Sequence, residues 1–447
     1  MGFGKLNLTF LKGLRSNAAG RGPVAVDCGA SGIKALQLEF TDTPTVAAAA
    51  FLPWTDPTTD PAKRLSAQLA ALPKFLKSAG MKGSRMVATV PAAQTYCKHL
   101  QLQLPEDDPT GASELVAGAI AGQLGCEPHG LCVRHMVVPS AGSAGRSEVI
   151  GMAVGRGLVK QFMDAARAAG MDLVAIHPEA VALLRGFDSL ARRGSDADMV
   201  SVYIDLGAAT SKVIVAHGTE LVFAKVVQLG GQFLDQAIAR SRNCSMAEAG
   251  DIRRSLLSGS GARAAPAAAP VATPADGVTT ALPGLGAAMA AASKAPVRSF
   301  ARATPAEPGS ADSGGIASST LAAATERRVG AQPAGLQVVT AEVDDLDRSA
   351  IGEAVDILTD EIALCLRYHD GLFPAKHVTR AVFVGGESQS VVLCQHMARK
   401  LRLSSHVADP LARMGRTDKL TAVGVDITKP QPGWAVPLGL CFCPTDL

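Results

Sequence analysis

Two stretches of the chain carry the same residue types at the same spacing. The shared residues are an aspartate, a glycine, an alanine and a lysine, which stand at Asp27, Gly29, Ala30 and Lys34 and again, without a gap, at Asp205, Gly207, Ala208 and Lys212. An apolar run precedes each stretch and another follows it, so each is predicted to be a β-hairpin whose first strand ends near the aspartate. The repeat predicts a protein with two related halves.

The two predicted hairpin turns have the composition of a phosphate site. The glycine of each turn allows a tight bend that brings backbone N–H groups against an anion, and Ser31, Thr210 and Ser211 add hydroxyl donors. The carboxylates of Asp27 and Asp205 repel phosphate, so we expect them to act through Mg²⁺ and its water ligands. One such turn alone would be an ordinary hairpin, whereas the matched pair favours phosphate binding.

A third glycine-rich turn follows an apolar strand nearer the C-terminus. Residues 381–388 read Ala-Val-Phe-Val-Gly-Gly-Glu-Ser and lead into a predicted helix. Gly385 and Gly386 would let a flat adenosine lie close to the backbone. Alone this would be an ordinary strand-to-helix turn, but beside the two hairpins it predicts the adenosine end of an ATP site.

Strand and helix patterns alternate along most of the chain, which predicts an α/β protein with sheets covered by helices. Strands are predicted at Val24–Val26, Lys34–Phe40, Arg85–Thr89, Val149–Val154, Val200–Ile204, Lys212–Val215, Leu221–Val227 and Arg380–Val384. Helices are predicted at Pro61–Ser78, Ala112–Gln123, Arg156–Ala169, Pro178–Gly186, Gly231–Arg240, Ile351–Leu366 and Gln389–Leu401.

The composition is that of a globular protein with two or more domains. The chain has 447 residues, of which 47% are hydrophobic and 19% charged, and this length exceeds a single ordinary core. A net charge of +3 and an aromatic content of 4% argue against nucleic acid as a partner. The nine cysteines stand singly among apolar residues, which indicates reduced thiols in a cytosolic protein.

Two segments fall outside the α/β pattern. Residues 1–22 lack the continuous apolar run of a signal peptide and are predicted to be a frayed tail, with a basic amphipathic helix at a membrane surface as the alternative. Residues 258–335 are rich in Ala, Pro, Gly and Ser. They are predicted to be a disordered insertion, because such a composition buries too little apolar surface to offset its ordering entropy.

The three loops, in this order, resemble those of the actin, heat-shock-70 and sugar-kinase superfamily. Within it the chain is most similar to the PilM family of type IV pilus assembly proteins, which is related to FtsA. Met86–Ala92, Leu104–Asp108 and Val149–Ala180 add to the similarity, which covers about residues 23–251 and 336–440. The third loop departs from a Gly-Gly-Gly pattern because it carries Glu387.

The resemblance implies a two-lobed actin-like fold, of the duplicated ribonuclease-H-like type, that binds ATP and Mg²⁺. It implies a first phosphate loop with Asp27, Gly29, Ala30 and Ser31, a second with Asp205, Gly207, Ala208 and Thr210, an adenosine loop with Gly385 and Gly386, and a Glu179 that faces the attacking water or the metal. The alternative for Glu179 is a first-turn acid favoured by the helix dipole. Whether ATP is weakly hydrolysed or only bound stays open.

The predicted division of the chain follows from the repeat and the resemblance. An N-terminal tail (1–22) is followed by a first lobe (23–198) with an inserted subdomain at about 91–169. The second lobe comprises 199–257 and 336–424, on either side of the disordered insertion (258–335), and residues 425–447 return to the first lobe.

The resemblance also implies a partner and a place in the cell. The expected partner is the N-terminal cytoplasmic tail of a PilN-like bitopic inner-membrane protein, bound at a groove on the first lobe in a manner coupled to the nucleotide state. Pilus motor ATPases and a second copy of the chain are further candidate partners. The protein is then expected to be cytoplasmic and held at the inner membrane by its partners.

Other functions compete with this prediction. A sugar-type kinase of the same superfamily would need an aspartate base in the cleft, and the stretch Val149–Gly157 offers no clear candidate. A nucleotide-free scaffold of the type II secretion kind would normally continue into a transmembrane helix. The spacing of Cys126, His129, Cys132 and His135 invites a zinc site, but a strand after Pro128 would place residues three apart on opposite faces.

Overall fold

The computed structural model describes residues 20–55, 60–105, 107–138, 145–188, 199–257 and 351–445. All of these belong to one compact unit. The predicted disordered insertion at 258–335 and nearly all of the predicted N-terminal tail lie outside the described residues. Only the end of that tail is described: Gly20–Arg21 form a short strand, β1, which pairs with β3.

The first sheet has seven strands and contains the first predicted hairpin. Its order is β15-β4-β3-β2-β5-β9, with β1 beside β3. The strands are β2 (Val24–Gly29), β3 (Gly32–Phe40), β4 (Thr45–Pro53), β5 (Arg85–Val90), β9 (Asp172–Pro178) and β15 (Gly415–Val423). β2, β3 and β4 form an antiparallel meander, while β5 runs parallel to β2 and β9 parallel to β5.

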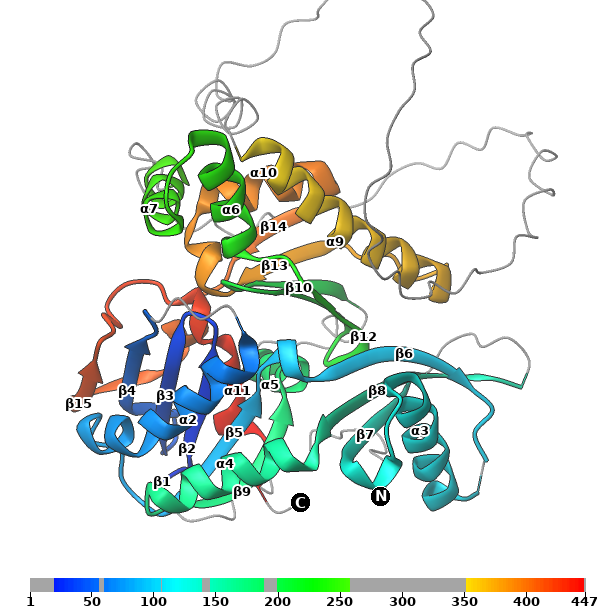
Figure 1. Cartoon of the computed structure of the whole chain (residues 1–447), viewed down its shortest axis with the longest axis horizontal. Helices are drawn as coiled ribbons and strands as arrows, with labels where there is room; N and C mark the ends of the chain where they lie inside the picture. The colour runs from blue at the N-terminus through cyan, green and yellow to red at the C-terminus, as the bar shows by residue number, and fades with distance from the viewer. Residues whose placement is uncertain are drawn as a thin grey trace, which may run out of the picture. The chain divides into compact units, whose positions relative to one another are not determined.

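Helices cover both faces of this sheet because its central strand is apolar on both sides. Val24, Val26 and Cys28 of β2 pack in one core cluster with α2 (Pro61–Ser78) and α4 (Arg156–Ala168). Alternate residues of a strand point to opposite faces, and Ala25 accordingly joins the other core cluster, with α5 (Glu179–Phe187) and α11 (Ala435–Phe442). Figure 1 shows α2 lying across the strands of this sheet.

The second sheet repeats the topology of the first. Its order is β12-β11-β10-β13-β14, with β10 (Val200–Leu206), β11 (Ser211–His217), β12 (Glu220–Val227), β13 (Arg380–Val384) and β14 (Ser404–Val407). Again an antiparallel meander is followed by parallel strands, as in the series β4-β3-β2-β5-β9. The predicted duplication is therefore confirmed at the level of strand order. The helices of this half are α6 (Gly231–Arg242), α7 (Met246–Leu257), α9 (Gly352–Leu372) and α10 (Val391–Leu401).

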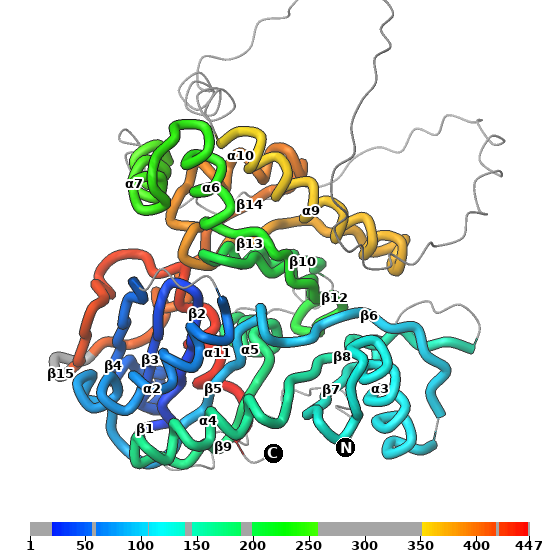
Figure 2. The backbone as a smooth tube through the Cα atoms, in the orientation of Figure 1, coloured from blue at the N-terminus to red at the C-terminus, as the bar shows by residue number. Residues whose placement is uncertain are grey.

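A small antiparallel sheet is inserted into the first half. Its order is β6-β8-β7, with β6 (Tyr96–Leu102), β7 (Leu131–Val138) and β8 (Ser147–Gly155), and α3 (Pro109–Leu124) packs on it. Figure 2 traces the chain from β5 into this sheet and back through α4 to β9. The strand predicted after Pro128 is β7.

The predicted α/β fold with a small inserted subdomain is confirmed, and each predicted strand and helix overlaps an observed one. The predicted domain boundaries stay a prediction, and two features bear on them. α4 lies inside the predicted insertion 91–169 but packs on α2 of the first half, and β15 lies inside 336–424 but pairs with β4 of the first sheet. Among the described residues, no helix is both long and apolar enough to cross a membrane.

The helices α5 and α11 cross at small residues. Both Ala182 and Gly439 are buried, and a Cβ atom added at Gly439 would collide with the carbonyl group of Ala182 and come close to Gly186. The close approach needs a glycine because the opposing atoms are backbone and cannot move aside as a side chain would.

We predict that Gly439→Ala destabilises the protein by about 1–3 kcal/mol through overpacking of this crossing. The measurement is urea unfolding followed by circular dichroism. Gly157→Ala is the matched control, because Gly157 is an exposed residue of α4 and an added Cβ there meets nothing within 4 Å. Equal unfolding midpoints for the two variants would contradict the close packing of α5 on α11.

Candidate functional site

The two repeated stretches form the hairpins predicted for them. In the β2–β3 pair Asp27 is opposite Lys34, and in the β10–β11 pair Asp205 is opposite Lys212. At the second turn the N–H group of Gly207 donates to the Thr210 carbonyl at 3.1 Å. A side chain at position 207 would collide with that carbonyl, so the tight bend requires glycine.

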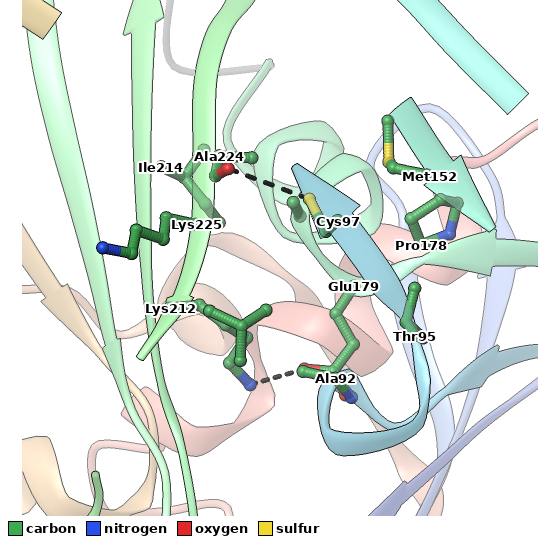
Figure 3. Close-up of a pocket in the computed structure, with 12 residues that line it drawn as sticks. Ala92, Thr95, Cys97, Met152, Pro178, Glu179, Lys212, Ile214, Ala224 and Lys225 are labelled. Atoms are coloured by element: carbon green, nitrogen blue, oxygen red, sulfur yellow. Dashed lines mark hydrogen bonds and ion pairs between the residues drawn. The ribbon is translucent and has the colours of Figure 1, made fainter. Parts of the chain in front are cut away.

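A buried cluster of charges joins the second hairpin to the start of α5. The Lys212 ammonium lies 2.8 Å from Oδ2 of Asp205 and 2.5 Å from Oε2 of Glu179. The other carboxylate oxygen of Glu179 accepts a hydrogen bond from the backbone N–H of Ala92 at 2.8 Å. Both carboxyl residues are less than 9% exposed. Figure 3 shows the side chains of Lys212 and Glu179 directed toward each other.

The first hairpin adds a second acid–lysine pair to this cluster. Nζ of Lys34 lies 3.9 Å from Oδ2 of Asp27, which is 7% exposed. Burial raises the pKa of Asp27 to about 6, where the favourable charges of Lys34 and Lys212 are opposed by Glu179 and Asp205. Gly433 lies beside both Lys34 and Gly386, and the neighbouring Gly385 lies against Asp205, so the structure brings the two acid–lysine pairs together from separate halves of the chain.

Lys212 is charged in this environment. Burial by itself would lower the pKa of its ammonium group, but Asp205 and Glu179 outweigh burial and raise that pKa above its ordinary value. A buried carboxylate without a counter-charge would cost several kcal/mol. Lys212 therefore stabilises both acids and links the second sheet to α5.

The third predicted loop meets the second hairpin. Gly385 has a φ of +94°, and a Cβ there would collide with the Leu206 carbonyl and the Asp205 side chain. Its N–H group donates to the Pro432 carbonyl at 2.9 Å. Gly386 packs against Gly433, and an added Cβ at Gly433 would lie 3.5 Å from the Lys34 ammonium. All three glycine-rich loops thus converge on one region.

The residue that breaks the Gly-Gly-Gly pattern has a structural partner. The Glu387 carboxylate forms an ion pair with Arg253 of α7, and Arg253 Nε lies 2.6 Å from Oδ1 of Asp235 in α6. Arg253 and Asp235 are buried. The triad anchors the third loop to α6 and α7. Sequence reasoning missed it, since nothing local connects Glu387 to Arg253, which lies 134 positions earlier.

The remaining predicted site residues lie in the turns, at the surface of the cluster. Ala30, Ala208 and Thr210 are half-buried and Ser31 is exposed, so their backbone or hydroxyl groups are open to a ligand. Two further charged residues, Lys34 and Lys212, were part of the repeat but were not predicted as site residues. Their matched positions were the signal that could have identified them.

The cluster fits a directly bound Mg²⁺ poorly. Carboxylates are suitable ligands for this ion, but the Lys212 ammonium already contacts both Asp205 and Glu179. Among the described residues, no three His, Cys, Asp or Glu side chains are grouped so that they could hold a metal ion. The predicted water-bridged Mg²⁺ at Asp27 and Asp205 stays a prediction.

Comparisons with known proteins point to one family. The family model described as type IV pilus assembly protein PilM matches residues 134–259. The solved structure of a PilM-PilN type IV pilus biogenesis complex matches with a TM-score of 0.62 at 16% identity, and the alignment covers 95% of this chain and 98% of that one. The chain is PilM-like. The resemblance to the PilM family that the glycine-rich loops predict is thereby confirmed.

Other comparisons are more distant. The ethanolamine utilization protein EutJ from Carboxydothermus hydrogenoformans matches with a TM-score of 0.44 at 12% identity, over 96% of this chain and 91% of that one. MreB 5 of Spiroplasma citri, in a structure bound to AMPPNP, matches with a TM-score of 0.38 at 10% identity, over 94% and 95%. No curated protein sequence matches the PilM-like chain.

The raised pKa of Asp27 predicts a pH-dependent stability difference for Asp27→Asn. In the folded state the Asp27 carboxyl group keeps its proton up to about pH 6, whereas the ordinary pKa of an aspartate is 3.8. Ionisation of Asp27 therefore destabilises the fold as the pH rises from about 4 to above 6. Relative to wild type, the variant should therefore gain about 1–3 kcal/mol in unfolding free energy between about pH 4 and pH 7.5.

Urea unfolding at both pH values measures this difference. Asp164→Asn, at an exposed position on α4, is the matched control and should leave the difference near zero. A pH-independent effect of Asp27→Asn would contradict the assignment of Asp27 to a buried cluster of charges.

Proposed function

We propose that the protein binds ATP between its two hairpin turns and acts as a nucleotide-responsive scaffold in type IV pilus assembly. Its partner is the N-terminal cytoplasmic tail of a PilN-like bitopic inner-membrane protein, which binds at a groove on the first lobe and holds the protein at the membrane. The observation that carries the proposal is the convergence of Asp27, Asp205, Lys34 and Lys212 beside three glycine-rich loops. The PilM-like family match and the PilM-PilN complex among similar structures support the process and the partner.

Each part of the site has a role in this proposal. Backbone N–H groups in the turns that follow Gly29 and Gly207 receive phosphate oxygens, Lys34 and Lys212 offset the phosphate charge, and the Gly385–Gly386 turn receives the adenosine. Mg²⁺ enters only as the counter-ion that accompanies ATP, and no step is assigned to it.

The state of Glu179 favours binding over turnover. As a base that activates water, Glu179 would need a free carboxylate oxygen, yet one oxygen is paired with Lys212 and the other accepts the Ala92 N–H. Both oxygens are thus engaged by protein donors and neither is reserved for a water molecule. We therefore propose that ATP hydrolysis is slow and that the bound nucleotide acts mainly through conformation.

A polar network connects the inserted sheet to the second half of the chain. His99 of β6 hydrogen-bonds Oε1 of Glu148 in β8 through Nδ1 at 2.8 Å, and Tyr368 of α9 donates to the same oxygen at 3.0 Å. The His99 ring stacks on Phe223 with centroids 4.8 Å apart, and its Nε2 accepts the Ala224 N–H at 3.3 Å. This His99 network joins four elements, β6, β8, β12 and α9, that are far apart in sequence.

The His99 network can couple the binding of ATP to the binding of the partner. ATP contacts both hairpins and so favours one arrangement of the two sheets. The inserted sheet is tied to β12 and α9 of the second sheet through the His99 network, and Figure 3 shows Cys97 of β6 beside Ala224 of β12. A partner that binds this arrangement better is then favoured by ATP through thermodynamic linkage.

Mg-ATP is expected to raise the melting temperature of the wild-type protein. At ATP concentrations about a hundredfold above Kd, binding adds about 2.7 kcal/mol of stability, which corresponds to a shift of about 2–4 °C. Asp205→Ala should abolish the shift, whereas Asp251→Ala, at an exposed position of α7, should keep it. Differential scanning fluorimetry with and without Mg-ATP gives the result. A wild-type protein without a shift would favour a nucleotide-free scaffold.

Tyr368→Phe is expected to uncouple the partner from the nucleotide. The variant loses one hydrogen bond to a buried carboxylate, so the ATP-dependent gain in affinity for the tail should shrink by about fivefold or more. Fluorescence anisotropy of a labelled tail peptide, with and without ATP, measures the gain. Tyr96→Phe is the control, since the Tyr96 hydroxyl donates to Gln123 of α3, the helix that packs on the inserted sheet. If ATP increases the affinity of Tyr368→Phe for the tail as much as it does for wild type, the His99 network does not couple the nucleotide to the partner.

A further inference from the structure

A cavity lies at the opposite end of α5 and β10, the elements that carry Glu179 and Asp205 of the charge cluster. Its volume is about 210 Å³. The residues that line it and carry the argument are Leu184, Phe187, Tyr203, Arg380, His406 and Arg413. They come from the end of α5, from β10, from the start of β13 and from β14, together with the short 3₁₀ turn Pro410–Arg413.

The cavity is separate from the hairpin turns. Glu179 opens α5 in the charge cluster, and Phe187 closes the same helix at the cavity, about 12 Å further along at 1.5 Å per residue. Asp205 lies near the end of β10, whereas Met199, beside the cavity, precedes that strand. A ligand in the cavity would therefore not occupy the phosphate loops.

The charge in the cavity is predominantly positive. Its one acid, Asp188, is paired with Arg185, whose NH1 lies 2.8 Å from Oδ2. Arg380 and Arg413 have no carboxylate partner within the part of the chain that the structure describes. Burial, with Arg380 as the second cause, lowers the pKa of His406, so this imidazole is neutral near pH 7 and offers a hydrogen bond without adding charge.

Arg380 is held in place for a ligand. Its Nε donates to the Ser201 hydroxyl at 2.8 Å. A guanidinium has five N–H donors, so this bond orients the group and leaves donors unused. Fixed guanidinium groups are the preferred protein partners of carboxylates and phosphates. Leu184, Phe187 and Val382 supply an apolar wall beside these donors.

We infer that this cavity binds a small organic anion. Its carboxylate or phosphate group contacts Arg380 and Arg413, and its apolar part lies against Leu184 and Phe187. Ligand sites commonly combine an apolar wall with a few placed polar groups in this way. The site is distinct from the proposed ATP site and does not require it.

Isothermal titration calorimetry at constant ionic strength tests the inference, with three probes: benzoate, phenyl phosphate and inorganic phosphate. Saturating Mg-ATP is present throughout, so that the phosphate loops are occupied. We expect benzoate or phenyl phosphate to bind. Phenyl phosphate should bind more tightly than inorganic phosphate, because its ring contacts the apolar wall. Preference for one of the two aromatic probes identifies carboxylate or phosphate as the recognised group.

Arg413→Gln should weaken this binding by about tenfold or more, because it removes a charge-assisted hydrogen bond. Arg413 is exposed, so the variant is expected to fold, and Arg380→Gln is a second variant with the same expected loss. Arg367→Gln, at an exposed position of α9, is the matched control and should bind as wild type does. No heat with any probe, or undiminished binding in Arg413→Gln, would overturn the inference.

Discussion

The contacts of Lys212 with Asp205 and Glu179 are the interaction on which the rest of the site depends. Two buried carboxylates from different elements need a counter-charge, because each would otherwise cost several kcal/mol in a poorly hydrated interior. One ammonium group supplies it for both. In doing so it ties the second hairpin to α5, and so joins the second sheet to the helix that follows β9 of the first.

The charge cluster also contains a group that destabilises the folded state when it ionises. Asp27 is buried beside the same charges, and its pKa is raised to about 6, so the folded chain holds a carboxyl group in a place that disfavours its ionised form. Clusters of this kind are more common at functional sites than elsewhere. The stabilising contacts lie around the cluster, in the α5–α11 crossing and in the Arg253–Glu387 pair, which keep the three loops close together.

Much of the fold could be predicted because its signals are local. Hydrophobic periodicity located the strands and helices, and the repeated Asp-x-Gly-Ala turn located both hairpins and the duplication. The pairing of β15 with β4 was not predictable, because those strands lie more than 350 residues apart in the chain. The Arg253–Glu387 pair and the Tyr368–Glu148 bond were missed for the same reason.

By itself the sequence determined which residues could serve a phosphate ligand, since the spacing of Asp, Gly and Lys in each hairpin is a property of adjacent residues. Only the tertiary structure decided what each charge does there. Lys212 could have projected toward solvent, but the packing of β11 beside α5 directs it to two acids. Side-chain electrostatics depend on distances of a few ångströms between distant segments, and those distances exist only after the two halves have folded together.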